Sequence, residues 1–424
     1  MIRAASLHNR KTNMNVQDVK RGTPRLRRIA GPAPNLSLAE RDRRHEAVRQ
    51  AMRGDGIDVL LLPASVARWE QTMADSRYLS MIGGFGTEAL TILGHDFVTT
   101  YVFNRADYWK SAQDWVVDVR DGHNYWARNL IERLREAGIA GGTLGIAGLA
   151  GLTRSPDGII PYSTVQQVRA ALPALRIANA TDLMQRIRAV KSAEEIAVMT
   201  HATRIAEAMI EGLDELQPGD TDKDVYRLLS NRLLCEGGEL PAMIIIGSGP
   251  AVGHGNFVPT DRRLMPGDIV IGEVEGRFLG YSGQIIRPRV LGPLRPDYAD
   301  LVAVAQACFD DLLHAMKAGS TLGDILRTYT ATITRDGGGD CQAAYPLMHA
   351  RGLGDDIPVV VTPKDGADLA DFVLEEGMVF VLKPRVARTG TPTAQVGDMV
   401  VVEARGGRRL GKASLAVKTL PYGW

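Results

Sequence analysis

Two acidic side chains and one histidine near the middle of the chain have the residue types and spacing for proton-transfer chemistry. Glu273 and Glu275 alternate along one apolar run, so in a strand both side chains point to the same face. Two carboxylates on one face can give an acid and a base, although Glu275 is better explained as a surface residue near a turn. His254 stands between Gly253 and Gly255, which let a substrate approach the imidazole. A loop histidine that bonds only to backbone is the simpler alternative.

A pair of strands joined by a short turn must position these residues. The stretch 252–289 begins as a glycine-rich loop, turns at 265–268 and continues as an Ile- and Val-rich strand over 269–274. A second turn near Gly280 leads into a second strand that runs through Arg287. The hairpin therefore carries the carboxylates, and the loop before it carries the histidine.

Four motifs between residues 186 and 384 match sequence patterns of one known protein family. They are the Gly280-Tyr281 pair with Arg287 in a G-Y-x-x-D-x-x-R pattern, the stretch 186–196, which is similar to R-x-x-K-S-x-x-E-I, the run His349-Ala-Arg-Gly-Leu-Gly, and the run Gly377-Met-Val-Phe-Val-Leu-Lys-Pro. In these motifs the chain resembles the pita-bread family of creatinase, aminopeptidase P, prolidase and methionine aminopeptidase. The resemblance covers residues 186–424 well and about 40–180 loosely.

The resemblance implies five metal-ligand positions, and this chain has unusual residues at most of them. Metal-dependent members use two Asp, one His and two Glu to hold two divalent ions, because hard carboxylate oxygens neutralise the ions' charge. The matching positions here are Glu273, Gln284, His349, Lys383 and Gly397. One carboxylate and one imidazole remain, beside a cation and a position without a side chain. We therefore expect no metal pair and no cofactor, while a single ion at Glu273, Gln284 and His349 stays open.

Creatinase is the precedent that the resemblance offers for this fold without metal. Its catalytic histidine stands in the loop that matches His254, so we expect His254, Glu273, Lys383 and His349 to be catalytic. Lys383 has three possible roles: it can bind a carboxylate or oxyanion, act as a base or nucleophile once desolvated, or form a structural ion pair. Arg351 can anchor a substrate carboxylate or be a purely structural arginine. The expected substrate-binding residues are Gln284, Arg351, Phe85 and Tyr281.

The chain divides into three parts. Residues 1–37 form a basic arm, which we expect to be flexible, and residues 38–185 form a smaller creatinase-like α/β domain of alternating strands and helices. Residues 186–424 form the pita-bread catalytic domain. The fold class is therefore α/β with α+β character.

The third part contains an internal repeat. Helices expected at about 194–214 and 221–236 are matched by helices at about 297–317 and 321–336, and strands follow each pair. This arrangement predicts the pseudo-two-fold symmetry of the pita-bread fold.

The composition excludes several classes of partner. With 50 basic and 49 acidic residues, the formal net charge is +1, which favours neither nucleic acid nor an anionic membrane. No run is long and apolar enough to span a bilayer, and residues 1–37 lack the apolar core of a secretory signal. Three cysteines without a C-x-x-C pair indicate reduced thiols, so we expect a cytoplasmic protein.

Together these residues favour a hydrolase that needs no metal and is not a peptidase. We expect it to cleave a C–N bond of the amide or amidino type in a small polar molecule, in the manner of creatinase, with His254 as general acid and base. A lyase on the same scaffold and a non-catalytic peptide- or protein-binding pseudo-peptidase are the alternatives. The resemblance also implies a homodimer in which the partner's N-terminal domain, near 85–88, lends residues to each site.

Overall fold

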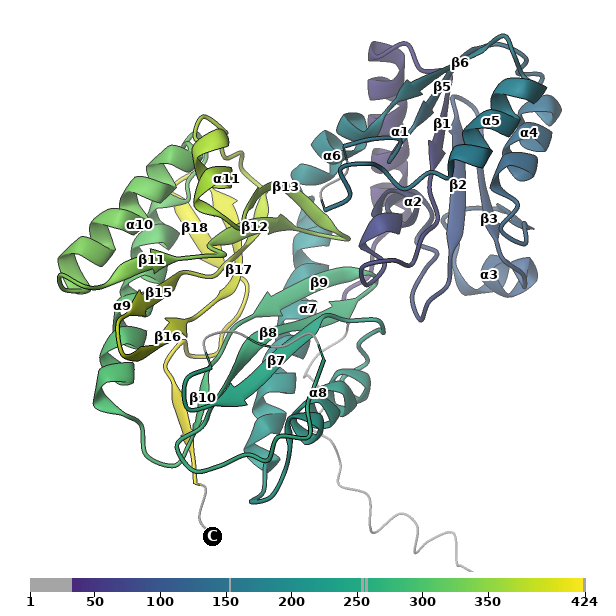
Figure 1. Cartoon of the computed structure of the whole chain (residues 1–424). Helices are drawn as coiled ribbons and strands as arrows, with labels where there is room; N and C mark the ends of the chain where they lie inside the picture. Colours follow the sequence, from purple (N-terminus) through teal and green to yellow (C-terminus); the bar gives the residue numbers. More distant parts are fainter. Residues whose placement is uncertain (1–32, 152–153, 253–254, 256–257, 422–424) are drawn as a thin grey trace, which may run out of the picture.

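A six-stranded mixed sheet forms the centre of the N-terminal part of the molecule (Figure 1). The computed structural model describes residues 33–151, 154–252, 255 and 258–421. The strands lie in the order β4-β3-β2-β1-β5-β6, and their bounds are β1 Val59–Leu62, β2 Ala89–Gly94, β3 Val98–Val102, β4 Asp118–Asp121, β5 Gly142–Ile146 and β6 Leu175–Asn179. Strand β1 pairs antiparallel with β2 and parallel with β5, and it is buried along its whole length.

Helices cover both faces of this sheet, because alternate residues of β1 point to opposite sides. Leu60 packs with α1, whereas Leu61 packs with α4 and α5. The helix bounds are α1 Leu38–Gly54, α2 Ala74–Ser80, α3 Ala106–Ala112, α4 Trp126–Glu136, α5 Tyr162–Ala171 and α6 Thr181–Ala189, with a 3-10 turn at Gln71–Met73. Along the described chain, no helix combines the length and the apolar composition that crossing a membrane requires.

The C-terminal part repeats one arrangement twice, as the sequence predicts. The first copy consists of α7 Ala193–Glu211, a 3-10 turn at Gly212–Glu215, α8 Asp222–Cys235, β7 Ile244–Gly249, β8 Ile269–Phe278, β9 Tyr281–Ile285 and β10 Arg289–Leu291. The second consists of α9 Pro296–Ala315, α10 Leu322–Asp336, β11 Gln342–Ala344, β12 Met348–Arg351, β13 Asp355–Val360, α11 Pro363–Asp368, β14 Val379–Leu382, β15 Arg385–Arg388, β16 Thr391–Gln395, β17 Asp398–Glu403 and β18 Gly406–Arg409. A last strand, β19 Lys418–Leu420, returns to pair with β10 in the first copy.

Matching caps begin the second helix of each copy. Thr221 precedes α8 and Thr321 precedes α10, and each closes a capping box with an aspartate three residues on, Asp224 or Asp324. Each box satisfies backbone N–H groups that the first turn of a helix leaves free. The two copies therefore share their helix-capping residues as well as their order of helices and strands.

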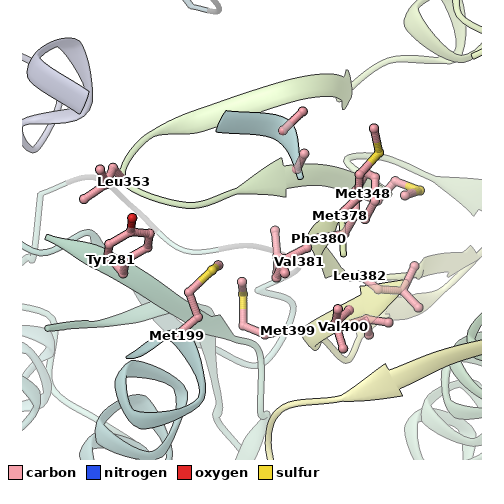
Figure 2. Close-up of a cluster of buried hydrophobic side chains, with 14 of the residues drawn as sticks. Met199, Tyr281, Met348, Leu353, Met378, Phe380, Val381, Leu382, Met399 and Val400 are labelled. Carbon is pink, nitrogen blue, oxygen red and sulfur yellow. The ribbon is translucent and has the colours of Figure 1, made fainter. Parts of the chain in front are cut away.

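The two copies meet through their sheets, which have the orders β19-β10-β8-β7, with β9 beside β8, and β13-β12-β14-β17-β18. Ile286 and Gly397 join them by two backbone hydrogen bonds of 3.0 and 3.1 Å. Figure 2 shows the apolar side chains that fill this junction, among them Met199 of α7, Phe380 of β14 and Met399 of β17. The sheets are thus one continuous scaffold with α7 packed on β8 and β9, and α9 on β16 and β18.

Buried ion pairs fix the N-terminal part against this scaffold. Arg188 of α6 donates to Asp75 at 2.7 Å and to Asp356 of β13 at 2.6 Å, and Lys191 reaches the same Asp356 at 2.6 Å. All four side chains are at most 5% exposed. Removing one partner of such a network leaves a buried charge uncompensated, so the network ties α2 and α6 to β13.

Candidate functional site

A cavity of about 540 Å³ lies where loops of the N-terminal part meet the two C-terminal sheets. The lining residues are Arg68, Trp69, Gln71 and Arg154 from the N-terminal part, and Met243, Ile245, Glu273, Pro346, His349, Arg351, Asp355, Val361 and Lys383 from the C-terminal part. Glu273 comes from β8 in the first copy of the repeat, and His349 comes from β12 in the second. Both copies therefore supply a functional side chain to one cavity of a size that suits a small ligand.

Lys383 and Glu273 form a buried ion pair in the wall of this cavity. The Nζ of Lys383, which follows β14, lies 2.6 Å from Oε1 of Glu273, and the side chains are 2% and 7% exposed. The other oxygen of Glu273 accepts a hydrogen bond of 2.5 Å from Nε2 of Gln284. Burial lowers the pKa of Lys383, and the attraction of Glu273 opposes this effect. The pair holds an amine donor in a fixed place, where it can polarise a substrate oxygen.

His349 and Asp355 form a second polar pair in the cavity. The Nδ1 of His349 lies 3.3 Å from Oδ1 of Asp355 and 3.3 Å from the carbonyl oxygen of Ala350. Two acceptors next to Nδ1 place the proton on that nitrogen, which leaves Nε2 free to accept one. Burial lowers the pKa of His349 to about 3, so the imidazole is neutral at neutral pH. Burial raises the pKa of Asp355, but Arg351, His349 and Arg154 together bring it below its usual range.

Arg351 is held by two carboxylates, those of Glu275 and Asp355. The prediction that Glu275 is a surface residue is wrong, because its side chain is fully buried and also accepts a hydrogen bond of 2.7 Å from Ser282. The strand explains the error: β8 continues to Phe278 instead of ending near 274, so Glu275 lies inside the hairpin. Because its guanidinium is already bound, Arg351 fits the structural role better than that of a substrate anchor.

The five positions that match the family's metal ligands do not fit a pair of divalent ions. Lys383 places an ammonium group against Glu273, and Gln284 offers that carboxylate an N–H group. A Cβ on Gly397 would lie 2.5 Å from Cδ1 of Ile286 and 2.9 Å from Cβ of Lys383, so other side chains fill the space of the fifth ligand. Across the described ranges, no three His, Cys, Asp or Glu side chains are grouped to hold a metal ion. Instead, three of the side chains at these positions contact one another, with Lys383 and Gln284 both donating to Glu273.

The structure brings together part of the predicted site. Four predicted residues line the cavity and a fifth contacts one of them: Glu273, His349, Arg351, Lys383 and Gln284. Tyr281 does not reach the cavity, because it is buried and donates its hydroxyl to Glu195 at 2.8 Å. Phe85 is 67% exposed and lies outside the lining. His254 lies outside the described residues.

Sequence reasoning missed the residues that the N-terminal part contributes. No motif marks Arg68, Trp69, Gln71 or Arg154. They reach the cavity through packing between the two parts of the chain, which no local pattern encodes. Asp355 had a weak signal, since it follows His349 closely on the next strand.

Two family models match the chain and together span most of it. One is described as metallopeptidase family M24 and matches residues 197–404, and the other, the creatinase/prolidase N-terminal domain, matches residues 44–190. With the fold described above, these matches show that the chain belongs to the pita-bread family of creatinase, aminopeptidase P and prolidase.

Individual relatives have moderate sequence identity to this chain. The Xaa-Pro dipeptidase of Pyrococcus furiosus is 25% identical over 260 residues, which are 60% of this chain and 72% of that protein. The probable dipeptidase PepE of Mycobacterium tuberculosis is 28% identical over 229 residues, 54% of this chain and 60% of PepE, less than two thirds of its length. The solved structure of an X-Pro aminopeptidase from Thermotoga maritima MSB8 aligns with a TM-score of 0.73 and 21% identity, covering 89% of this chain and 99% of that one.

These comparisons overturn one expectation from the sequence. The expectation of a creatinase-like, non-peptidase C–N hydrolase that needs no metal is wrong, because the relatives are named as dipeptidases and this chain matches a family described as metallopeptidases. The replaced residues at the ligand positions suggest creatinase-like chemistry, although the fold around them is that of the wider family. The fold around those positions is shared with the solved X-Pro aminopeptidase.

Proposed function

We propose that this protein is a hydrolase that cleaves the amide bond of a short peptide, of dipeptide size. The observation that carries the proposal is the cavity itself, in which Lys383 and the His349–Asp355 pair line one space in a chain that matches a metallopeptidase family. The names of the relatives support a peptide as the substrate class. The cavity volume of about 540 Å³ supports a substrate of a few residues at most.

The side chains of this chain account for the proton transfers of such a reaction. Neutral His349 accepts a proton from water at Nε2, while Asp355 stabilises the imidazolium that forms. The hydroxide attacks the carbonyl carbon, and the ammonium of Lys383 donates a hydrogen bond to the oxygen that becomes negative. The C–N bond then breaks as His349 returns its proton to the leaving nitrogen, which gives a carboxylic acid and an amine. The acid passes its proton to the amine, so a carboxylate and an ammonium group are released.

Release of proline from glycyl-proline and of leucine from glycyl-leucine by the purified full chain tests this proposal. We expect turnover of at least one dipeptide and, in His349→Gln, a fall of kcat/KM by about 100-fold or more. Lys364→Ala is the control, because this lysine is 79% exposed and lies outside the cavity. Parallel assays with and without added Mn²⁺ separate the contribution of these side chains from that of an added ion. Dipeptides that bind without being cleaved would contradict the hydrolase.

Assembly and location belong to the same proposal. A homodimer is supported by exposed aromatic side chains on the N-terminal part, which include Phe85, Phe103 and Tyr108. A cytoplasmic location is supported by the three cysteines, all of which are free thiols. No partner other than a second copy and a small substrate is proposed.

A further inference from the structure

One cation at the cavity differs from the others in having no counter-charge. Lys383 pairs with Glu273, Arg351 pairs with Glu275 and Asp355, and Arg154 donates through Nε to Asp355 at 2.9 Å. The guanidinium of Arg68 is exposed and forms no ion pair or hydrogen bond within the described part of the chain. With His349 neutral, the cavity therefore has an excess of positive charge, and that excess lies on the side of the N-terminal part.

Arg154 adds free donors on the same side. Only its Nε contacts Asp355, and its side chain is 32% exposed. Its two terminal nitrogens donate to no residue in the described ranges. Arg68 and Arg154 thus present planar N–H donors to one cavity, a geometry that suits the two oxygens of a carboxylate.

The backbone that carries Arg68 is strained and firmly held. Arg68, Trp69 and Glu70 have φ angles of 49°, 56° and 63°. This left-handed conformation costs free energy for any residue other than glycine. Buried contacts compensate for it: the carboxylate of Glu70 accepts from the N–H groups of Gly84 and Gly86 at 3.1 and 2.9 Å. A strained segment fixed in this way next to a cavity is typical of a functional site.

Further contacts hold the same segment. Arg277 of β8 donates to the carbonyl oxygen of Trp69, and both Arg77 and Arg277 pair with Glu70. These three side chains come from both parts of the chain, and all of them are at most 3% exposed. The network fixes the backbone of Arg68 and Trp69 at the cavity before any ligand arrives, which lowers the entropy cost of binding.

We propose that Arg68 and Arg154 form a subsite that binds the C-terminal carboxylate of the substrate. This subsite rests on the proposed function for the identity of the ligand, a short peptide with a free C-terminus. It places the scissile amide between the two arginines and the Lys383–His349 side of the cavity. It also explains why the cavity carries a cation without a partner.

Isothermal titration calorimetry, which measures the affinity of the protein for two non-cleavable probes, tests the subsite. The probes are glycyl-proline in which CH2 replaces the peptide carbonyl, and the C-terminal amide of the same compound. We expect the acid to bind at least about tenfold more tightly than the amide. Arg68→Ala should abolish most of this preference and leave the affinity for the amide unchanged. Because Arg68 is exposed and unpaired among the described residues, this substitution leaves the fold intact.

Matched variants and the assay of turnover separate the possible outcomes. Arg154→Ala should also reduce the preference for the acid, whereas Arg327→Ala, a 72% exposed arginine on α10, should leave it unchanged. Equal affinities for acid and amide in the unaltered protein, or a preference that survives in Arg68→Ala, would overturn the subsite. A preference for the acid without turnover of any dipeptide would keep the subsite and overturn the hydrolase. Turnover without the preference would do the reverse.

Discussion

Lys383 is the residue on which the stability of the site depends most directly. Its ammonium lies 2.6 Å from Glu273, and both side chains are buried. In Lys383→Met the carboxylate of Glu273 stays buried without its cation, so we expect the free energy of unfolding to fall by about 3–5 kcal/mol. Urea denaturation followed by circular dichroism measures this fall.

A second substitution separates charge from packing at this pair. Adding Glu273→Gln to Lys383→Met removes the orphan charge and keeps the shape, so most of the lost stability should return. If the double variant were as unstable as the single one, the loss would come from packing around Lys383 instead. In that case the ion pair would not be the main interaction at this position.

His349 makes stability depend on pH in a defined direction. Burial lowers its pKa to about 3 in the native protein, whereas histidine in an unfolded chain titrates near about 6.5. Between these values the unfolded state binds a proton that the native state does not. The free energy of unfolding therefore falls as the pH drops below about 6.5, by up to about 1.4 kcal/mol per pH unit.

Urea unfolding at about pH 7 and about pH 5 measures this dependence. His349→Gln should lose about 2 kcal/mol less than the unaltered protein over this interval, because glutamine takes up no proton. The comparison cancels the contributions of other groups that titrate in both proteins, such as buried His45, whose pKa burial also lowers. Equal losses in the two proteins would show that His349 is protonated in the native state.

At the residue scale, the sequence predicts the site residues that lie in recognisable motifs, but not those that reach the cavity only through packing of the folded chain. His349, Lys383 and Glu273 stand in recognisable runs, and they do meet in one cavity. The partners that set their protonation could not be inferred, because Asp355 acts through a distance of 3.3 Å that depends on the turn after β12. Arg68 and Arg154 lie in no motif, so their approach to the cavity follows only from the folded structure.

At the element scale, the helices of the C-terminal part were predictable because their signals are local. Polar caps such as Ser192, Thr221 and Thr321, followed three residues later by an acid, begin α7, α8 and α10. The end of β8 was not predictable in the same way. Its last residues form a hairpin that buries Glu275 against Arg351, and a charged residue near a turn otherwise reads as surface.

The segment that carries Arg68 shows the limit of local reasoning about elements. Left-handed backbone is normally signalled by Gly or Asn, yet here three consecutive residues, 68–70, adopt it with larger side chains. Glu70 holds this conformation through partners far away in the sequence, among them Arg277. The shape of this segment is therefore a product of the junction between the two parts of the chain.

At the scale of the whole molecule, the site exists only because the two parts are locked together. Arg188 bridges Asp75 of the N-terminal part and Asp356 of the C-terminal part, and all three are buried. The cavity takes its arginine side from one part and its Lys383–His349 side from the other. The architecture could be predicted from the order of elements, but this docking could not, because it depends on single ion pairs between distant residues.

The exposed aromatic side chains of the N-terminal part lead to a prediction about assembly. Phe103, Tyr108 and Tyr125 are 52%, 55% and 57% exposed, and the first two line a shallow hollow together with Trp109. Aromatic residues are enriched in interfaces and depleted on free surfaces, so we expect this face to bind a second copy. Light scattering after size exclusion should give twice the chain mass of 46.0 kDa.

A charge placed on this face tests where the two copies meet. Tyr108→Glu should yield the monomer, because an interface of standard size does not tolerate an unpaired carboxylate among its buried aromatic residues. Leu234→Glu is the matched control, since Leu234 is an exposed apolar residue on α8 of the C-terminal part, and it should remain dimeric. A monomeric unaltered protein would contradict the dimer, and a dimeric Tyr108→Glu would contradict its placement on this face. If Tyr108→Glu also lowers dipeptide turnover while the cavity residues are unchanged, the second copy contributes to the site, as the exposure of Phe85 favours.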